Sequence, residues 1–223
     1  MNRYQRPADR PTTSNAQFRC LADGRNRLIL RTLRSRSPIG RSTLVSLLVD
    51  EFYQHRSSSD PTTSARVSLH HELLPRLAEA DLIEFDERMV SASAHPVFEA
   101  TSRSGVLDSD SGTDETALDT LFEALADDRR RLVWTLCRRR GSISVETLAR
   151  VIGALEHAGG SDTEFRSRVQ RIHVSLVHDH IPRLESVGLI GRSDDGTLEV
   201  DADAEVDPST VVTVDPVDAH LFG

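Results

Sequence analysis

The chain has 223 residues and a formal net charge of −8, and only 38% of its residues are hydrophobic and 4% aromatic. A chain of this length forms one or two domains with modest cores, and none of its apolar runs approaches the roughly 20 residues of a membrane-spanning helix. The N-terminal segment "MNRYQRPADRPTTS" carries charge without an apolar centre, which is unlike a secretory signal. We therefore expect a cytoplasmic protein that contacts no membrane.

Every basic residue is an arginine: the chain has 27 arginines, 35 acidic residues and no lysine, although lysine is normally among the commonest residues. This composition resembles that of proteins from salt-accumulating haloarchaea. Arginine is more weakly hydrated than lysine and keeps its planar fork of donors. A high-GC codon bias would also exchange lysine for arginine without salt adaptation. We expect a halophilic protein of haloarchaeal origin, for which a net charge of −8 does not exclude DNA as a partner.

An internal repeat divides the chain. The segment "RVSLHHELLPRLAEADLI" (66–83) returns as "HVSLVHDHIPRLESVGLI" (173–190). Upstream of it, "LADGRNRLILRTL" (21–33) returns as "LADDRRRLVWTLC" (125–137). The repeat predicts two units of the same design.

Composition predicts where the units end. The segment "TSRSGVLDSDSGTDE" is polar, contains glycine and serine and shows no period, which is typical of a flexible linker. The C-terminal "PSTVVTVDPVDAHLF" alternates apolar and polar residues, so it could add a strand to the second unit or offer a strand edge to a partner. The predicted organisation is a disordered N-terminus at 1–14, a degenerate first unit at 15–100, an acidic flexible linker at 101–115, a second unit at 116–205 and a tail with a possible extra strand at 206–223.

The first unit shows its elements faintly. Apolar spacing predicts a helix within 21–33 and another around Thr43 and Leu44, and "LIEFDERMVS" stands where a hairpin would follow. Its third helix begins in "SSSDPTTSARV", which is poor helix-forming material and contains Pro61.

The second unit is clearer. Apolar residues recur at helical spacing from Leu118 to Cys137, and Asp127 can cap a new helix that Gly141 can end. Ser144 is predicted to cap the next helix. Asp162 is predicted to cap a third helix of about four turns, whose apolar stripe comprises Phe165, Val169, Ile172 and Leu176.

Pro182 should break this third helix. A proline inside a helix removes one backbone hydrogen bond and clashes with the preceding turn, so the helix is predicted to end or kink near His180, as at Pro75 in the first unit. After Gly188, "LIGRSDDGTLEV" predicts a β-hairpin with a tight Asp-Gly turn. The predicted fold is mainly α with small β-hairpins: two tandem winged helix-turn-helix units.

Two motifs support this fold. "LADDRRRLVWTL" resembles the opening "L-A-D-x-x-R-R-x-x-I-L-x-x-L" of ArsR-like regulators, and "HIPRLESVGLI" resembles the segment that closes their third helix and enters the wing. The pattern "Y/H-x-S-L-x-x-x-H-[LI]-P-x-L" is similar to an uncharacterised haloarchaeal winged-helix family, often found in tandem. The resemblance implies the fold and, more distantly, transcriptional regulation. The departures in the first unit are Asp81 for the Gly188-type residue, and Gly24 and Asn26 for Asp128 and Arg130.

The third helix of a winged helix enters the major groove of DNA. Opposite its apolar stripe, the predicted DNA-binding residues are Arg166, Arg168, Gln170, Arg171 and His173. Arginine can bind guanine O6 and N7, and glutamine can bind adenine. The alternative is a solvated helix face whose arginines pair with carboxylates such as Glu164. The wing is not expected to grip phosphate, because Asp194 and Asp195 occupy its tip.

The first unit lacks these side chains. The positions aligned with Arg166, Arg168, Gln170 and Arg171 hold Ser59, Pro61, Thr63 and Ser64. Its recognition helix therefore looks inactive, and we expect the unit to serve dimerisation, ligand sensing or contact with a protein partner.

The sequence gives little support for a metal site or for catalysis. His173, His178 and His180 invite a metal site, but His178 and His180 point to different sides of a helix. We interpret His178, aligned with His71, as an interior residue with a structural role, and Cys137 as a small core residue. The sequence contains no phosphate loop, G-x-S-x-G, HExxH or CxxC motif. We expect neither an enzyme nor a bound cofactor or metal.

The sequence thus predicts a DNA-binding transcriptional regulator of a haloarchaeon, in which the second winged helix reads the major groove of double-stranded DNA. The alternative is a protein–protein interaction scaffold built from winged helices, without affinity for DNA. The two hypotheses differ in whether the arginines of the third helix form one exposed face.

Overall fold

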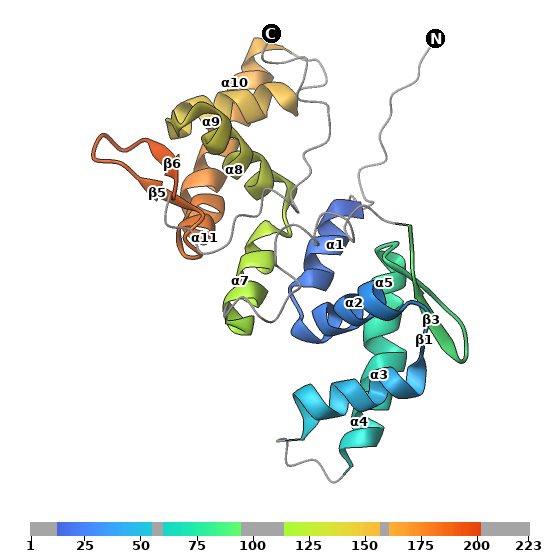
Figure 1. The fold of residues 1–223 in the computed structure, drawn as a ribbon. Coiled ribbons are helices and arrows are strands. Elements are labelled where there is room, and N and C mark those ends of the chain that lie inside the picture. Colours follow the sequence, from blue (N-terminus) through green and yellow to red (C-terminus); the bar gives the residue numbers. More distant parts are fainter. Residues whose placement is uncertain (1–12, 55–59, 95–113, 157–160, 202–223) are drawn as a thin grey trace, which may run out of the picture. The chain divides into compact units, whose positions relative to one another are not determined.

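A computed structural model describes residues 13–54, 60–94, 114–156 and 161–201 of the chain. The chain divides into two compact units, residues 1–111 and 112–223, and each is described by itself. Both are mainly helical with a small antiparallel sheet (Figure 1), which confirms the predicted fold class. The described helices include none that is long and apolar enough to cross a membrane.

The first unit has the element order of a winged helix. Its helical elements are α1 (Thr13–Leu21), α2 (Gly24–Arg36), α3 (Arg41–Leu48), the π-helical turn η1 (Val49–Tyr53), α4 (Pro61–Ser68), the π-helical turn η2 (Leu69–Leu73) and α5 (Leu74–Glu79). Its strands are β1 (Ile39–Gly40), β2 (Ile83–Phe85) and β3 (Met89–Ala92), in the spatial order β1-β3-β2. Val90 pairs with Ile39 on one side and Phe85 on the other.

The second unit repeats this plan. Its helical elements are α7 (Glu115–Leu125), α8 (Asp128–Arg140), α9 (Val145–Leu155), α10 (Asp162–Ser175), the π-helical turn η4 (Leu176–His180) and α11 (Ile181–Glu185). Its strands are β4 (Ser142–Ile143), β5 (Ile190–Arg192) and β6 (Leu198–Val200), in the order β4-β6-β5. Leu198 pairs with Ile143 and Arg192. Sequence periodicity does not predict β1 and β4, because a strand of two residues is too short to show an alternation of apolar and polar side chains.

The helix ends follow the predicted caps with one exception. Asp127 accepts a hydrogen bond from the backbone N–H of Arg130 and begins α8, Gly141 ends it with a positive φ of 76°, and Ser144 caps α9. The cap of α10 is Ser161 rather than the predicted Asp162. Ser161 forms a reciprocal capping box with Glu164, which satisfies two backbone donors where a single Asp would satisfy one.

The predicted boundaries need small corrections. Residues 13 and 14, expected to be disordered, begin α1, and the last two residues of the expected linker, Asp114 and Glu115, cap and begin α7. The rest of the segments 1–14 and 101–115, and the whole tail 206–223, lie outside the described residues.

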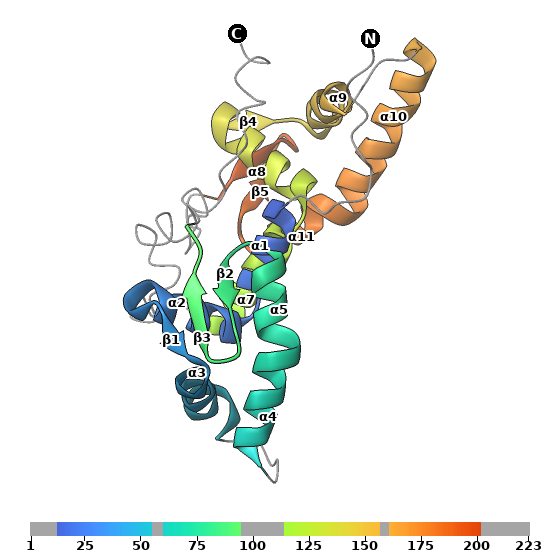
Figure 2. The ribbon, with the colours of Figure 1, turned by 90° about the vertical axis from the view of Figure 1, so that its right-hand side faces the viewer.

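The predicted end of the third helix near its proline is wrong, and a π turn precedes the proline in each unit. The backbone stays in the right-handed helical region at His180 and Ile181, and the helix continues from α10 through η4 into α11. The first unit shows the same course from α4 to α5 (Figure 2). In η4 the N–H of Ile181 donates to the carbonyl of Leu176, five residues back. This wider π turn accommodates the missing N–H of Pro182, as η2 does for Pro75.

The turn after the third helix explains one departure between the units. Gly188 has a φ of 67°, and Asp81 at the matched position has a φ of 57°. Aspartate tolerates the left-handed region better than most residues. Asp81 therefore preserves the backbone path into the wing without a glycine.

Each unit encloses its own apolar core, to which every long helix contributes. The predicted stripe of α10 lies partly there: Ile172 and Leu176 are buried, whereas Phe165 and Val169 are half-buried. Both cysteines are buried, as predicted for Cys137, and burial raises the pKa of Cys20 to about 11 and that of Cys137 to about 12.

Candidate nucleic-acid interface

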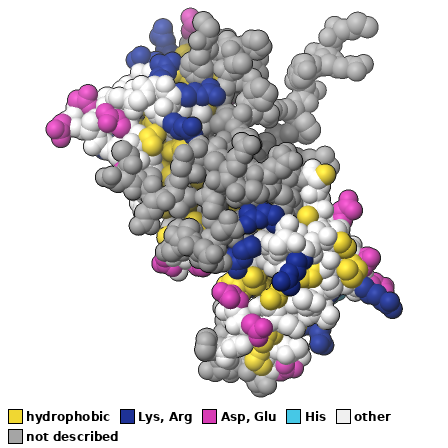
Figure 3. Space-filling view, viewed as in Figure 1, with side chains coloured by type: hydrophobic (Ala, Val, Ile, Leu, Met, Phe, Trp, Pro, Cys, Tyr) yellow, Lys and Arg dark blue, Asp and Glu magenta, His cyan; other side chains and the backbone are white. Residues whose placement is uncertain are grey.

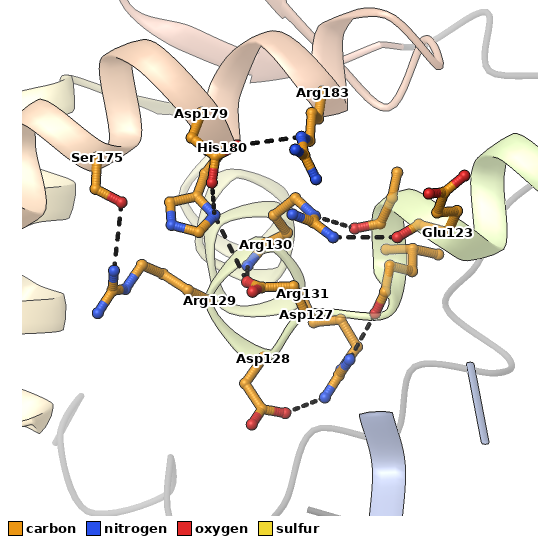
Figure 4. A network of polar contacts seen from close by, with 12 residues as sticks. Glu123, Asp127, Asp128, Arg129, Arg130, Arg131, Ser175, Asp179, His180 and Arg183 are labelled. Atoms are coloured by element: carbon orange, nitrogen blue, oxygen red, sulfur yellow. Dashed lines mark hydrogen bonds and ion pairs between the residues drawn. The ribbon is translucent and has the colours of Figure 1, made fainter. Parts of the chain in front are cut away.

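Three consecutive arginines at the start of α8 hold the second unit together. Arg131 Nη1 donates to the carbonyl of Leu125 at 2.5 Å, at the end of α7. Arg130 donates to the carbonyls of Glu123 and Ala124 (Figure 4). Each helix end leaves carbonyls without partners inside the helix. Arginines of one helix therefore cap the helix before it.

The first unit uses the same device. Arg27, matched with Arg131, donates to the carbonyl of Leu21 at 2.6 Å and is almost fully buried. Asn26 replaces Arg130 and is buried as well. The motif that begins "LAD" is thus a structural motif: its aspartate caps the next helix and its second or third arginine caps the previous one.

The first arginine after the capping aspartate is Arg129 in the second unit and Arg25 in the first. It connects the first long helix of its unit to the third helix. Arg129 Nη2 lies 2.7 Å from Glu156 Oε1, and its Nη1 lies 3.5 Å from Ser175 Oγ (Figure 4). The matched Arg25 Nη1 donates to Ser68 Oγ at 2.9 Å. Because the same arginine–serine contact recurs in both units, the third helix is held by α2 and by α8 in the same way.

A close approach of two helices fixes α10 further. A Cβ built on Gly153 of α9 would lie 2.8 Å from Cγ2 of Val169 and 3.6 Å from Phe165. Glycine permits this close approach, because a Cβ at this position would push against the side chain of Val169. Val49 occupies the matched position in the first unit, where the helix continues as the π turn η1.

The structure separates the five predicted DNA-binding residues. Arg166, Gln170 and Arg171 are exposed on the outer face of α10. Arg168 instead turns toward α9, where its Nη1 donates to the carbonyl of Glu156 at 2.9 Å and its Nε is buried. His173 Nε2 lies 3.6 Å from Glu146 Oε1 on α9.

The three outward residues share their surface with one carboxylate, that of Glu164. Neither an ion pair nor a hydrogen bond joins the side chains of Arg166 and Arg171 to any residue that the structure describes. The carboxylate of Glu164, the suspected partner, accepts a hydrogen bond from the backbone N–H of Ser161 at 2.8 Å. Together with Glu164, the residues Arg166, Gln170 and Arg171 line an open depression along α10, and basic side chains gather in the upper part of the second unit in Figure 3.

One residue of this face escaped sequence reasoning. Val174 is 47% exposed, which is high for a large apolar side chain, and it continues the row of Arg166 and Gln170 at intervals of four residues. The aligned Val67 of the first unit is 53% exposed. An apolar residue shared by the two repeats indicates a core position from the sequence alone. In both units it is a surface position.

The wing is acidic, as its sequence indicates. Arg192 Nε donates to Glu185 Oε1 at 2.7 Å, so its charge is paired at the base of the wing. At the tip, hydrogen bonds from Ser193 and Thr197 lower the pKa of Asp195 to about 2. Acidic side chains mark this tip in Figure 3. The wing is therefore unsuited to bind phosphate directly.

The histidines are placed differently from the prediction. His178 and His71 are exposed, not interior, because the buried face of the third helix passes through the residues two positions before and two positions after each of them. The buried residue is His180, whose Nδ1 lies 3.6 Å from Asp127 and 3.9 Å from Asp179 (Figure 4). Burial, assisted by Arg129 and Arg130, lowers the pKa of His180. The described histidines, cysteines and carboxylates form no group that could hold a metal ion.

The family comparison agrees with the internal repeat. A model described as a domain of unknown function (DUF7344) matches residues 18–91 and again residues 122–199. The comparisons with curated proteins and with solved structures find no match. Each match runs from the last turn of the arginine-capped helix, α1 or α7, into the wing of the same unit, and together the matches cover most of the chain. The chain therefore belongs to the DUF7344 family and carries its domain twice.

Proposed function

We propose that the protein is a DNA-binding transcriptional regulator of a haloarchaeon, and that α10 of the second unit enters the major groove. The observation that carries this proposal is the outer face of α10, where Arg166, Gln170 and Arg171 are exposed and the two arginines have no partner among the described residues. An arginine that serves only the fold would be paired, as Arg129 to Arg131 are.

The side chains of this face match the chemistry of base edges. Arg166, Gln170 and Val174 form one row that spans about 12 Å along the helix, the length of three to four base pairs at 3.4 Å each. Arginine can donate two hydrogen bonds to guanine, glutamine can form two hydrogen bonds with adenine N6 and N7, and a valine can contact the methyl group of thymine. Arg171 lies beside this row, where it can bind a backbone phosphate.

A high-salt cell favours this type of interface. At molar salt the Debye length is about 3 Å, so distant charges contribute little and only direct contacts persist. A net charge of −8 and acidic wings are then compatible with DNA binding. Two short-range arginines and their polar neighbours are sufficient for selective contact.

The proposal is tested by fluorescence anisotropy in molar KCl, with duplex fragments from upstream of the protein's own gene and a shuffled duplex. We expect selective binding by the wild type. Each direct base contact is worth about 1–3 kcal/mol, so Arg166→Ala/Arg171→Ala should weaken it at least about tenfold. The matched control is Arg150→Ala, which removes an exposed arginine of α9. If the wild type binds no fragment, or the double variant binds as the wild type does, the interaction-scaffold hypothesis gains instead.

A further inference from the structure

A groove opens on the first unit between α3 and the helix formed by α4 and η2. It encloses about 590 Å³ and its lining comes from three places: the start of α3, the outer face of α4 and η2, and the tip of the wing. The lining residues include Arg41, Val45, Arg66, Val67, His70 and Glu87. A winged helix presents these same three elements to DNA.

The cationic side chains of this groove are available. Arg66 has neither an ion pair nor a hydrogen bond with any described residue. The matched residue of the second unit, His173, leans toward Glu146. In the first unit Ser42 stands where Glu146 would be, so the side of the groove next to Arg66 stays open.

Arg41 lies at the mouth of the groove beside an imidazole and an aromatic ring, and Arg41 is also attracted by the carboxylate of Asp86 in the wing. Its Nη1 lies 3.3 Å from Nδ1 of His70, and its guanidinium lies 5.1 Å from the centre of the Phe85 ring on β2. Both contacts orient the arginine without neutralising it. Among the described residues that line the groove, Glu87 is the single carboxylate, and it belongs to the wing tip.

The residues that begin α4 explain why alignment of the two repeats does not indicate a basic surface on the first unit. Asp60 caps α4 and accepts hydrogen bonds from Thr63, and Ser64 donates to the carbonyl of Asp60. Pro61 occupies the first turn, where it is tolerated. The positions of Arg168 and Arg171 in α10 therefore hold residues that here begin the helix, Pro61 and Ser64. The two arginines of the groove lie elsewhere: Arg66 is in the last turn of α4, and Arg41 begins α3.

We infer that the first unit also binds duplex DNA, with a backbone phosphate between Arg41 and Arg66 and with Val67 facing the base edges. Val67 lies at the register of Val174, so the two units present the same apolar residue at the same point of the third helix. The phosphate lies at the first turn of α3, where backbone N–H groups add to the attraction. This inference rests on the proposed function and extends it: the chain engages DNA at two places.

Hydroxyl-radical footprinting of the full-length protein on a fragment bound by the wild type tests the inference. We expect two protected segments. Arg41→Ala/Arg66→Ala should remove protection from one of them, and the slope of log K against log[KCl] should become shallower by about 0.9 for each phosphate that the variant no longer neutralises. Arg66→Glu alone changes an exposed residue, so it separates loss of binding from loss of folding. Arg36→Ala, at an exposed position on α2, is the matched control.

The outcomes separate this inference from the proposed function. If Arg41→Ala/Arg66→Ala and Arg66→Glu leave footprint and salt slope as in the Arg36→Ala control, the inference is overturned. The proposed function then stands, provided that Arg166→Ala/Arg171→Ala still abolishes protection. If only the first-unit variants lose protection, the inference stands and the assignment to α10 fails.

Discussion

At the scale of single residues, buried arginines hold consecutive helices of each unit together. Arg27 and Arg131 are 2% and 6% exposed and donate to the last carbonyls of the preceding helix. A charged donor on a buried carbonyl contributes more than a neutral one, and its removal leaves the carbonyl unsatisfied. The aspartate four residues earlier caps the next helix, so two side chains define one helix–helix corner.

Arg131→Ala should lower the free energy of unfolding by about 1–3 kcal/mol, because the carbonyl of Leu125 loses its buried donor. Chemical denaturation monitored by circular dichroism measures this change. Arg150→Ala on the exposed side of α9 should stay within about 0.5 kcal/mol of the wild type. Equal effects of the two substitutions would show that burial of Arg131 contributes nothing to stability.

His180 should make the second unit sensitive to acid. Its pKa is lowered from 6.5 by burial, with Arg129 and Arg130 adding to the effect and Asp127 and Asp179 opposing it. The unfolded chain therefore takes up a proton at higher pH than the folded chain does. Stability is complete above the unfolded pKa and is lost as pH falls through 6.5 toward the folded pKa.

His180→Leu introduces the residue type of the aligned, fully buried Leu73. The variant should lose less stability than the wild type between about pH 7 and pH 5, because it removes one proton-binding group. Thermal unfolding at several pH values measures the difference. His178→Gln, at an exposed position, should keep the wild-type profile. An unchanged profile for His180→Leu would contradict the role assigned to this histidine.

At the scale of elements, the contact between α9 and α10 determines which face of α10 points outward. Gly153 allows α10 to approach, Arg168 caps the end of α9 through the carbonyl of Glu156, and Arg129 joins Glu156 and Ser175. These contacts leave the row of Arg166, Gln170 and Val174 on the outside. A change at Gly153 should therefore move the DNA-facing row as a whole.

Gly153→Ala tests this packing. Alanine favours the helix by about 1 kcal/mol, but the new methyl group collides with Val169, a stiff β-branched residue, and overpacking costs about 1–3 kcal/mol. The expected net result is destabilisation by about 1 kcal/mol in denaturant unfolding. The cost should shrink in a Val169→Ala background. Gly191→Ala, with no atom within 4 Å of the new Cβ, should be neutral; a similar destabilisation there would refute the close-packing explanation.

The limits of sequence reasoning are visible in the third helix. Periodicity located α10 and the capping signals located most helix ends, because both depend on neighbours within one turn. The π turns depend on how the chain absorbs a missing donor at Pro75 and Pro182, and a proline alone indicates only a break. Helical spacing also placed Arg168 outside, since it could not show that the free carbonyls at the end of α9 lie within its reach.

At the scale of the whole molecule, the two copies of the domain share one scaffold and differ in their outer faces. The second unit concentrates exposed polar side chains at the start of its third helix, whereas the first has its cations in the groove beside α3. At the positions of Arg168 and Arg171, α4 instead has Pro61 in its first turn and Ser64, which donates to the carbonyl of Asp60. The repeat therefore predicts the fold of both units well and the chemistry of each face poorly.

The most direct test of α10 as the major-groove element is protection of guanine from methylation by dimethyl sulfate, which reacts at N7 in the major groove. The account predicts protection of guanine N7 within a segment of about three to four base pairs. Protection there should disappear in Arg166→Ala/Arg171→Ala and persist in Arg150→Ala. A bound fragment whose guanines all stay reactive would contradict entry of α10 into the major groove.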